Sequence, residues 1–325
     1  MKISEAIKGY ILDCKVRGRS HRTVEWYEQK LNYVARWLIE EEDAQRLEQV
    51  TVAMLRAFVL HMHAAPVGRT TVNKNGDTTR ISPLTVKGYV QVIKGFFNWC
   101  YREELVENNI SERLKLPSVP DYLIPVFRED HIKSMIDACD LSTTLGYRDY
   151  VIILVLLETG IRISELCGLR IQDVHDDYIR VVGKGTKERE VGVSPGVAKH
   201  LWKYIYRHRK VHHEAEHRVF INRYGEPLMP TGVDQLLGDI KERSGITGVR
   251  VSAHTFRHTF ACMYLEQGGE IYKLSKLMGH SAVDVTEEYL KNFNIRAARR
   301  DQEKFSPVQA LNLLNGRRKK RKQAE

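Results

Sequence analysis

Apolar residues recur at helical spacing along most of the chain, and the first third contains four such stretches. Intervals of three and four residues predict amphipathic helices over 3–16, after Ser20, after Thr51 and after Ser82. Each of these serine and threonine residues can cap a first turn, and the proline that follows Ser82 suits the first helical position. The first third is therefore predicted to be a small four-helix domain.

A proline-rich stretch and a long apolar run mark the start of a second domain. Residues 116–127, LPSVPDYLIPVF, contain three prolines and no helical period, which predicts an extended linker. A capped helix over 129–139 follows it. The apolar segment at 147–157, unbroken from Tyr150 to Leu157, then predicts the central helix of a second core, ended by Gly160 in the left-handed region.

The pattern changes to β-type after this central helix. Residues 178–182 and 189–193 are rich in valine and isoleucine and are joined by GKGTKE, which predicts a β-hairpin. A basic amphipathic helix over 196–212 and an extended segment over 219–222 are expected next. The predicted fold class is mostly α with a small β-sheet in the C-terminal domain.

The composition of the 325 residues, 42% hydrophobic and 28% charged, is that of a soluble globular protein. The sequence has no apolar run long enough to span a membrane and no N-terminal signal region, so we expect a cytoplasmic protein with no membrane partner. The cysteines are isolated and indicate buried thiols in a reducing compartment, not disulfides or zinc ligands. They are Cys14, Cys100, Cys139, Cys167 and Cys262.

The formal net charge of +10 and the pI near 9.3 favour a polyanionic partner such as a nucleic acid. Two basic stretches leave alternatives open. Residues 68–80, GRTTVNKNGDTTR, are either a solvated loop or small hairpin, or an insertion that contacts DNA. The run of six basic residues at 317–322 is either a tail that grips DNA or a solvated one.

Polar side chains with useful chemistry are densest at 252–291, SAHTFRHTFACMYLEQGGEIYKLSKLMGHSAVDVTEEYLK. Two helix-like segments lie in this stretch, each ended by glycine, and a capping-box pattern predicts a third, short helix near its end. A pair of core helices needs few polar groups at its ends, whereas a site that binds a phosphate and attacks it with a tyrosine needs several. The stretch holds His254, Arg257, His258, His280 and Tyr289.

A metal site is the alternative to this interpretation. His254 and His258 are four residues apart and share a helix face, which two zinc ligands could do. The helix lacks the adjacent glutamate of an HExxH motif, however, and Arg257 lies between the histidines, where a cation opposes a divalent metal. We predict no metal site. Satisfied core histidines beside a surface arginine would account for each residue singly, but poorly for the set.

Two upstream features are ambiguous on their own. Arg162 and Glu165 lie three apart at a helix start, so they form either a surface salt bridge or a pair in which Glu165 braces the guanidinium. The local pattern favours the salt bridge. Lys184 lies in the glycine-flanked hairpin turn, where it is either an exposed turn lysine or a side chain that reaches into a neighbouring groove.

Together these segments resemble the tyrosine recombinases, also called the phage integrase family. The resemblance rests on several boxes in the expected order and spacing: Arg162 in TGIRISEL, Lys184 in GKGTKER, His254 and Arg257 in HTFRH, His280 in LMGH, and Tyr289 in TEEYL. It is close over 127–293 and looser over the preceding helical domain. Met278 in place of a more usual leucine and Lys291 in place of a frequent histidine are small departures.

The resemblance implies a division into a SAM-like core-binding domain (1–115), a linker (116–127), a catalytic domain (128–293) and a C-terminal segment (294–325), with the two domains forming a C-shaped clamp on DNA. It also implies a homotetramer on double-stranded DNA with inverted binding sites, assembled by exchange of the C-terminal segment. A nucleoid-associated location is expected, and accessory DNA-binding proteins are compatible with it. Neither metal nor another cofactor is implied.

The resemblance assigns a role to each site residue. Tyr289 attacks the scissile phosphate, Lys184 protonates the leaving 5′-oxygen, and His254 accepts the tyrosine proton. The remaining residues bind the phosphate or support those that do, and they are Arg162, Arg257, His280, Glu165 and His258. The implied activity is site-specific recombination through a 3′-phosphotyrosyl intermediate and a Holliday junction. A type IB topoisomerase and a DNA-binding regulator without catalytic activity are the alternatives.

Overall fold

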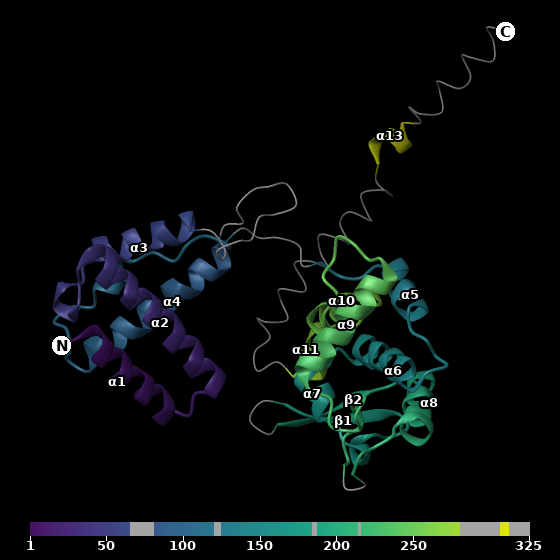
Figure 1. The fold of residues 1–325 in the computed structure, drawn as a ribbon. Coiled ribbons are helices and arrows are strands. Elements are labelled where there is room, and N and C mark those ends of the chain that lie inside the picture. The colour runs from purple at the N-terminus through teal and green to yellow at the C-terminus, as the bar shows by residue number, and fades with distance from the viewer. Residues whose placement is uncertain (66–80, 120–124, 184–186, 214–215, 280–305, 312–325) are drawn as a thin grey trace. The chain divides into compact units, whose positions relative to one another are not determined.

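The computed structural model describes residues 1–65, 81–119, 125–183, 187–213, 216–279 and 306–311. The chain divides into two compact units, Met1–Tyr122 and Leu123–Glu325 (Figure 1). Each unit buries its own cluster of apolar side chains. The basic segments at 68–80 and 317–322 lie outside the described residues.

The first unit contains the four predicted helices. Their capping residues act as expected, since the hydroxyl oxygens of Ser20, Thr51 and Ser82 each accept a hydrogen bond from an amide in the first turn that follows, at 3.2–3.3 Å. Between and after the helices lie the short 3₁₀ turns η1 (Leu47–Gln49) and η2 (Ile110–Arg113). The helices are α1 (Ile3–Val16), α2 (His21–Glu42), α3 (Val52–Ala64) and α4 (Pro83–Arg102).

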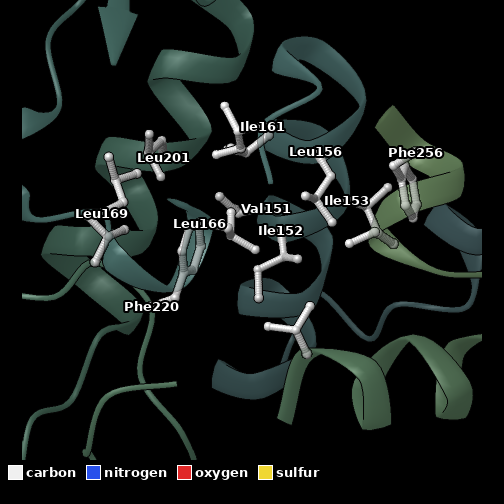
Figure 2. Packing of buried hydrophobic residues seen from close by; sticks show 14 of the residues in the cluster. Val151, Ile152, Ile153, Leu156, Ile161, Leu166, Leu169, Leu201, Phe220 and Phe256 are labelled. Carbon is white, nitrogen blue, oxygen red and sulfur yellow. The ribbon is translucent and has the colours of Figure 1, made fainter. Parts of the chain in front are cut away.

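The second unit is built around the helix predicted from the apolar run. This helix, α6 (Thr144–Thr159), is buried along most of its length, and side chains from the surrounding elements pack on it (Figure 2). Around it lie α5 (Glu129–Asp137), α7 (Ile163–Gly168), η3 (Ile171–Asp173), α8 (Pro195–Lys203), α9 (Pro230–Ser244), α10 (Ala253–Glu266) and α11 (Ile271–Met278). The four-residue helix α13 (Pro307–Ala310) follows later in the chain.

The predicted hairpin is present as an antiparallel pair of strands. Strand β1 (Tyr178–Val182) pairs with β2 (Glu188–Gly192), so the second strand begins one residue earlier than predicted. The Gly183 amide donates to the Lys187 carbonyl at 2.8 Å and closes the turn. The fold-class prediction, mostly α with a small sheet, is confirmed.

The helix predicted over 196–212 is shorter than expected. It ends at Lys203 and continues as a π-helical turn, η4 (Tyr204–His208), in which the Arg209 amide donates to the Tyr204 carbonyl at 2.9 Å. The wider turn brings Tyr204 and Ile205 into the core, which a uniform 3.6-residue pattern does not predict. Within the segment expected to be extended, 219–222, Ile221 forms an isolated antiparallel bridge with Pro227.

Among the described residues, no helix combines the length and apolarity that a membrane crossing needs. In the same part of the chain, no three histidine, cysteine or carboxylate side chains gather closely enough to hold a metal ion.

Candidate active site

The end of α6 places the first predicted site residue. Gly160 caps the helix with φ of 58°, as predicted, and a Cβ at this position would lie 2.4 Å from Cδ1 of Phe260. The chain therefore turns sharply beneath α10 and enters α7 within three residues. Arg162 is the residue that caps α7. The tight turn thus brings Arg162 to the C-terminal end of the central helix.

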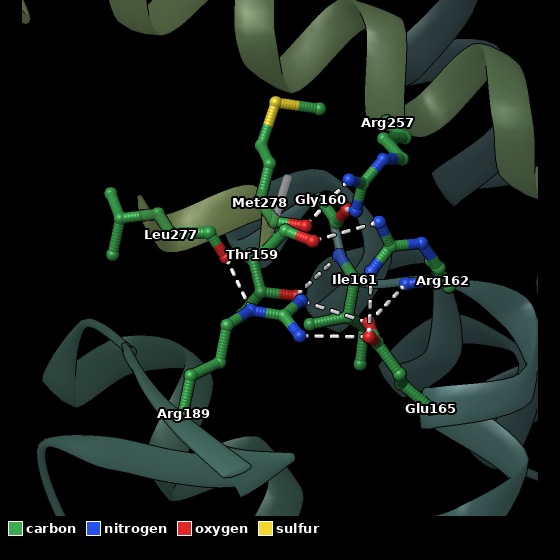
Figure 3. A network of polar contacts seen from close by, with 10 residues as sticks. Thr159, Gly160, Ile161, Arg162, Glu165, Arg189, Arg257, Leu277 and Met278 are labelled. Carbon is green, nitrogen blue, oxygen red and sulfur yellow. Dashed lines mark hydrogen bonds and ion pairs between the residues drawn. The ribbon is translucent and has the colours of Figure 1, made fainter. Parts of the chain in front are cut away.

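Arg162 and Glu165 are in contact, but Glu165 does not lie on the surface. The Arg162 amide donates to Oε2 of Glu165 at 2.8 Å, and Arg162 Nη1 donates to Oε1 at 3.0 Å (Figure 3). Glu165 is only 3% exposed, whereas the Arg162 side chain is 38% exposed. The salt bridge favoured by the local sequence pattern is present, but its expected place on the surface is wrong, because tertiary packing buries the carboxylate and leaves the guanidinium accessible.

A second arginine completes the surroundings of this carboxylate. Arg189, on β2, donates from Nη1 to Oε1 of Glu165 at 2.7 Å and from Nη2 to Oε2 at 2.9 Å. Its Nε donates to the Leu277 carbonyl on α11 at 2.6 Å. Sequence reasoning missed Arg189 and treated it as an ordinary strand residue. The available signal was a cation on a short strand directly after the lysine-bearing turn.

Glu165 remains ionised because of its two arginine partners. Burial alone would raise the pKa of Glu165, but hydrogen bonds from the Arg189 side chain and the Arg162 amide, with the positive charge of Arg189, outweigh it. They hold the pKa below its ordinary value of 4.5. A buried anion is therefore fixed between the two guanidinium groups.

Arg257 joins the ends of two helices. It is 4% exposed, and it donates from Nη1 to the Gly160 carbonyl at 2.7 Å and from Nη2 to the Met278 carbonyl at 2.6 Å (Figure 3). Both carbonyls lie at helix C-termini, where unpaired oxygens and the helix dipole favour a cation. Arg162 Nη2 donates to the next carbonyl, that of Gly279, at 3.1 Å. The two predicted phosphate-binding arginines thus meet at the end of α11.

The histidines of α10 have different environments. His254 is exposed and His258 is buried, and their rings lie 4.1 Å apart. Burial, followed by the neighbouring His254 and Arg257, lowers the pKa of His258 to about 4. His258 is therefore neutral near pH 7, which suits a supporting role and not that of a proton donor.

The structure brings Arg162, Glu165, Arg257, His254 and His258 to the region where α6, α7, α10 and α11 meet. Lys184, His280 and Tyr289, with the short helix predicted to carry the tyrosine, lie outside the described residues. In sequence, His280 directly follows Gly279, whose left-handed conformation (φ of 62°) ends α11 as predicted.

This combination of fold and arginine site is that of a known family. Residues 125–295 match the phage integrase family, and residues 7–75 match the phage integrase N-terminal SAM-like domain. The chain belongs to the phage integrase family, and it is a tyrosine recombinase, an enzyme that breaks and rejoins DNA.

Within this family the chain is similar to the Xer recombinases. It is 28% identical over 281 residues to tyrosine recombinase XerD of Listeria monocytogenes serovar 1/2a, a match that covers 84% of this chain and 89% of XerD. It is 30% identical over 263 residues to tyrosine recombinase XerC of Anoxybacillus flavithermus, covering 77% and 81%.

The fold is shared with a DNA-bound integrase. The Tn1549 transposon integrase in complex with circular intermediate DNA superposes with a TM-score of 0.70 at 18% identity, over 89% of this chain and 95% of that one. The Xer relatives favour a site-specific recombinase over a topoisomerase or a regulator without catalytic activity.

Proposed function

We propose that this recombinase cleaves double-stranded DNA by attack of Tyr289 on the scissile phosphate, and rejoins the strands through a Holliday junction. The observation that supports this most directly is the meeting of Arg162 and Arg257 at adjacent carbonyls of Gly279 and Met278. Two guanidinium groups held this close together suit the two non-bridging oxygens of one phosphate. Preorganised cations of this kind stabilise the charge that develops during phosphoryl transfer.

The two arginines differ in exposure, and this suggests a division of work. Arg257 is buried and fixed to backbone carbonyls, so it contributes positive charge from a rigid position. Arg162 is accessible and braced by Glu165, so its guanidinium can meet the phosphate as DNA docks. Glu165 is a positioning residue in this proposal and does not contact DNA.

The remaining roles follow from the chemistry of the step. Tyrosine has an ordinary pKa near 10, so its attack requires a proton acceptor, and His254 on the exposed face of α10 fills that role. Lys184 donates a proton to the departing 5′-oxygen, and His280 donates a hydrogen bond to the phosphate. The phosphotyrosyl bond keeps the energy of the phosphodiester, so the cycle needs neither metal nor nucleotide.

Assembly completes the proposal. The first unit binds DNA as a core-binding domain over 1–115, and residues 128–293 act as the catalytic domain. Four copies assemble on inverted sites by exchanging the segment 294–325, with accessory DNA-binding proteins as further partners. The exposed apolar side chains of Val308 and Leu311, on and next to α13, support a docking role for this segment.

The test is a variant that lacks only the nucleophile. DNA that the wild-type protein traps covalently is sequenced, and the trapped site is built into a nicked suicide duplex. We expect the wild-type protein to form a covalent adduct with this duplex, and Tyr289→Phe to bind it with unchanged affinity but form none. The readout is a shifted band on a denaturing gel. An adduct formed by Tyr289→Phe would refute the assignment of the nucleophile.

A further inference from the structure

We propose that Arg189 is a positioning residue for DNA cleavage, which holds Arg162 through Glu165 and fixes the end of α11 through the Leu277 carbonyl. The inference rests on the proposed function of Arg162 as a phosphate ligand. Arg189 itself does not contact DNA in this proposal. Its side chain is 13% exposed, and its hydrogen bonds point at the protein.

The geometry of Arg189 requires a guanidinium group. One face of its fork binds both oxygens of the Glu165 carboxylate, at 2.7 and 2.9 Å, while Nε binds the Leu277 carbonyl at 2.6 Å (Figure 3). Bidentate pairing of this kind fixes direction as well as distance. A lysine ammonium is a point charge on a flexible stem and cannot hold all three acceptors at once.

Arg189 is also one of three arginines that bind consecutive carbonyls. Arg189, Arg257 and Arg162 donate to the carbonyls of Leu277, Met278 and Gly279, in that order. The last carbonyls of a helix have no partner within the helix, so the arginines replace the missing hydrogen bonds. The packing is tight, since a Cβ on Gly279 would lie 2.9 Å from Nη1 of Arg189.

Arg189 connects three parts of the site. It lies on β2 opposite Val181, five residues after Lys184 in the sequence. Through its side chain this strand is tied to Glu165 on α7 and to the last turn of α11. The Arg189 side chain therefore anchors three parts of the site: the strand after the lysine turn, the residue that braces Arg162, and the helix that precedes His280.

A purely structural ion pair is the alternative, and it predicts a different result. A structural arginine stabilises the fold, and its loss lowers the melting temperature without a specific effect on the chemical step. A positioning arginine affects the rate of cleavage of fully bound DNA, measured at saturating protein, because a displacement of about 1 Å can slow a reaction about 100-fold. The two roles are separated by comparing rate, affinity and stability in the same variants.

The experiment compares Arg189→Gln and Arg189→Lys with Arg209→Gln. Arg209 is a matched control, since it is a half-buried arginine of the same unit that donates to the carbonyls of Arg218 and Glu216. Single-turnover cleavage of the trapped-site suicide duplex is measured at saturating protein, alongside the Kd for the duplex and the melting temperature.

We expect both Arg189 variants to cleave about 100-fold more slowly than the wild type, with Kd changed by less than about threefold. We expect Arg209→Gln to cleave at a rate within about threefold of the wild-type rate. Its melting temperature should fall by at least as much as those of the Arg189 variants. The inference would be overturned if Arg189→Gln cleaved at the wild-type rate, or if Arg189→Lys restored the wild-type rate in full. If the wild-type protein itself formed no adduct, the proposed function would fail instead.

A double variant covers the case in which Arg189→Gln does not fold, because loss of the arginine leaves the buried Glu165 with one partner fewer. Glu165→Gln/Arg189→Gln removes the buried charge together with its partner. Residues that act as a unit are not additive, so we expect the double variant to be folded and no slower than Glu165→Gln alone. Cleavage at the wild-type rate by the double variant would also overturn the inference.

Discussion

Of two buried ionisable side chains in the same site, one is held charged and the other neutral. Glu165 stays negative because two arginines donate to it, and His258 stays neutral because burial and the nearby Arg257 disfavour a second cation. The anion offsets part of the charge of Arg162 and Arg189 and holds their guanidinium groups in place, while neutral His258 adds no charge beside Arg257. The same two residues make the stability of the fold depend on pH.

His258 makes the stability of the fold depend on pH in a predictable direction. Its pKa is lowered from 6.5 to about 4 in the folded protein, so the unfolded chain binds the extra proton between these values. The stability is therefore fully present above pH 6.5 and declines as the pH falls towards 4, by up to about 1.4 kcal/mol per unit.

Urea unfolding between pH 5 and 7 measures this dependence. This range lies above the ordinary Glu165 pKa of 4.5, so that titration of Glu165 contributes little to it. We expect a shallower dependence in His258→Gln than in the wild type. His217→Gln, which changes an exposed histidine of the same unit, is the control and should keep the wild-type slope. An unchanged slope in His258→Gln would contradict the prediction.

At the scale of elements, the ends of helices matter more for the site than their middles. Gly160 ends α6, its carbonyl accepts from Arg257, and its left-handed conformation leaves no space for a side chain against Phe260. The closing turns of α6 and α11 together supply the carbonyls that hold Arg257 and Arg162. The position of the arginines therefore depends on how these two helices terminate.

Gly160→Ala tests this dependence. Alanine at φ of 58° is strained by about 1–2 kcal/mol, and its Cβ would lie 2.4 Å from Cδ1 of Phe260. We expect a loss of at least about 2 kcal/mol in urea unfolding and slower DNA cleavage. Gly268→Ala is the control, since Gly268 also has a positive φ but no atom within 4 Å of its Cβ position. Equal losses in the two variants would show that the contact with Phe260 contributes nothing.

The elements that were predicted correctly are those encoded by local signals. The caps at Ser20, Thr51 and Ser82, the apolar run of α6 and the terminating Gly160 each act within a few residues of the chain. Periodicity and capping chemistry therefore located the helices of the first unit and the central helix of the second.

The errors concern contacts between distant segments. The burial of Glu165 depends on Arg189, which lies on a different element, and the π turn at η4 depends on a core that accepts Tyr204 and Ile205. The sequence around Glu165 reads as a surface helix start, because nothing local shows which neighbour covers it. Arg189 was missed for the same reason, since its partners on α7 and α11 are far from it in the sequence.

At the scale of the whole molecule, the chain consists of two units with separate apolar clusters and a strong positive charge of +10. The charge favours association with the phosphate backbone independently of sequence. Separate clusters allow each unit to fold around its own core. We therefore expect that one unit can be destabilised without unfolding the other.

Matched core variants test the independence of the two units in DNA-free protein. Leu55 in the first unit and Leu156 in the second are both fully buried, and leucine to alanine at such positions costs about 2–5 kcal/mol. We expect two calorimetric transitions, of which Leu55→Ala shifts one and Leu156→Ala the other. Tryptophan fluorescence assigns them, because three of the four tryptophans lie in the first unit, namely Trp26, Trp37 and Trp99. The fluorescence change should therefore follow mainly the transition that Leu55→Ala lowers. A single transition that both variants shift equally would show instead that the two cores unfold as one cooperative unit.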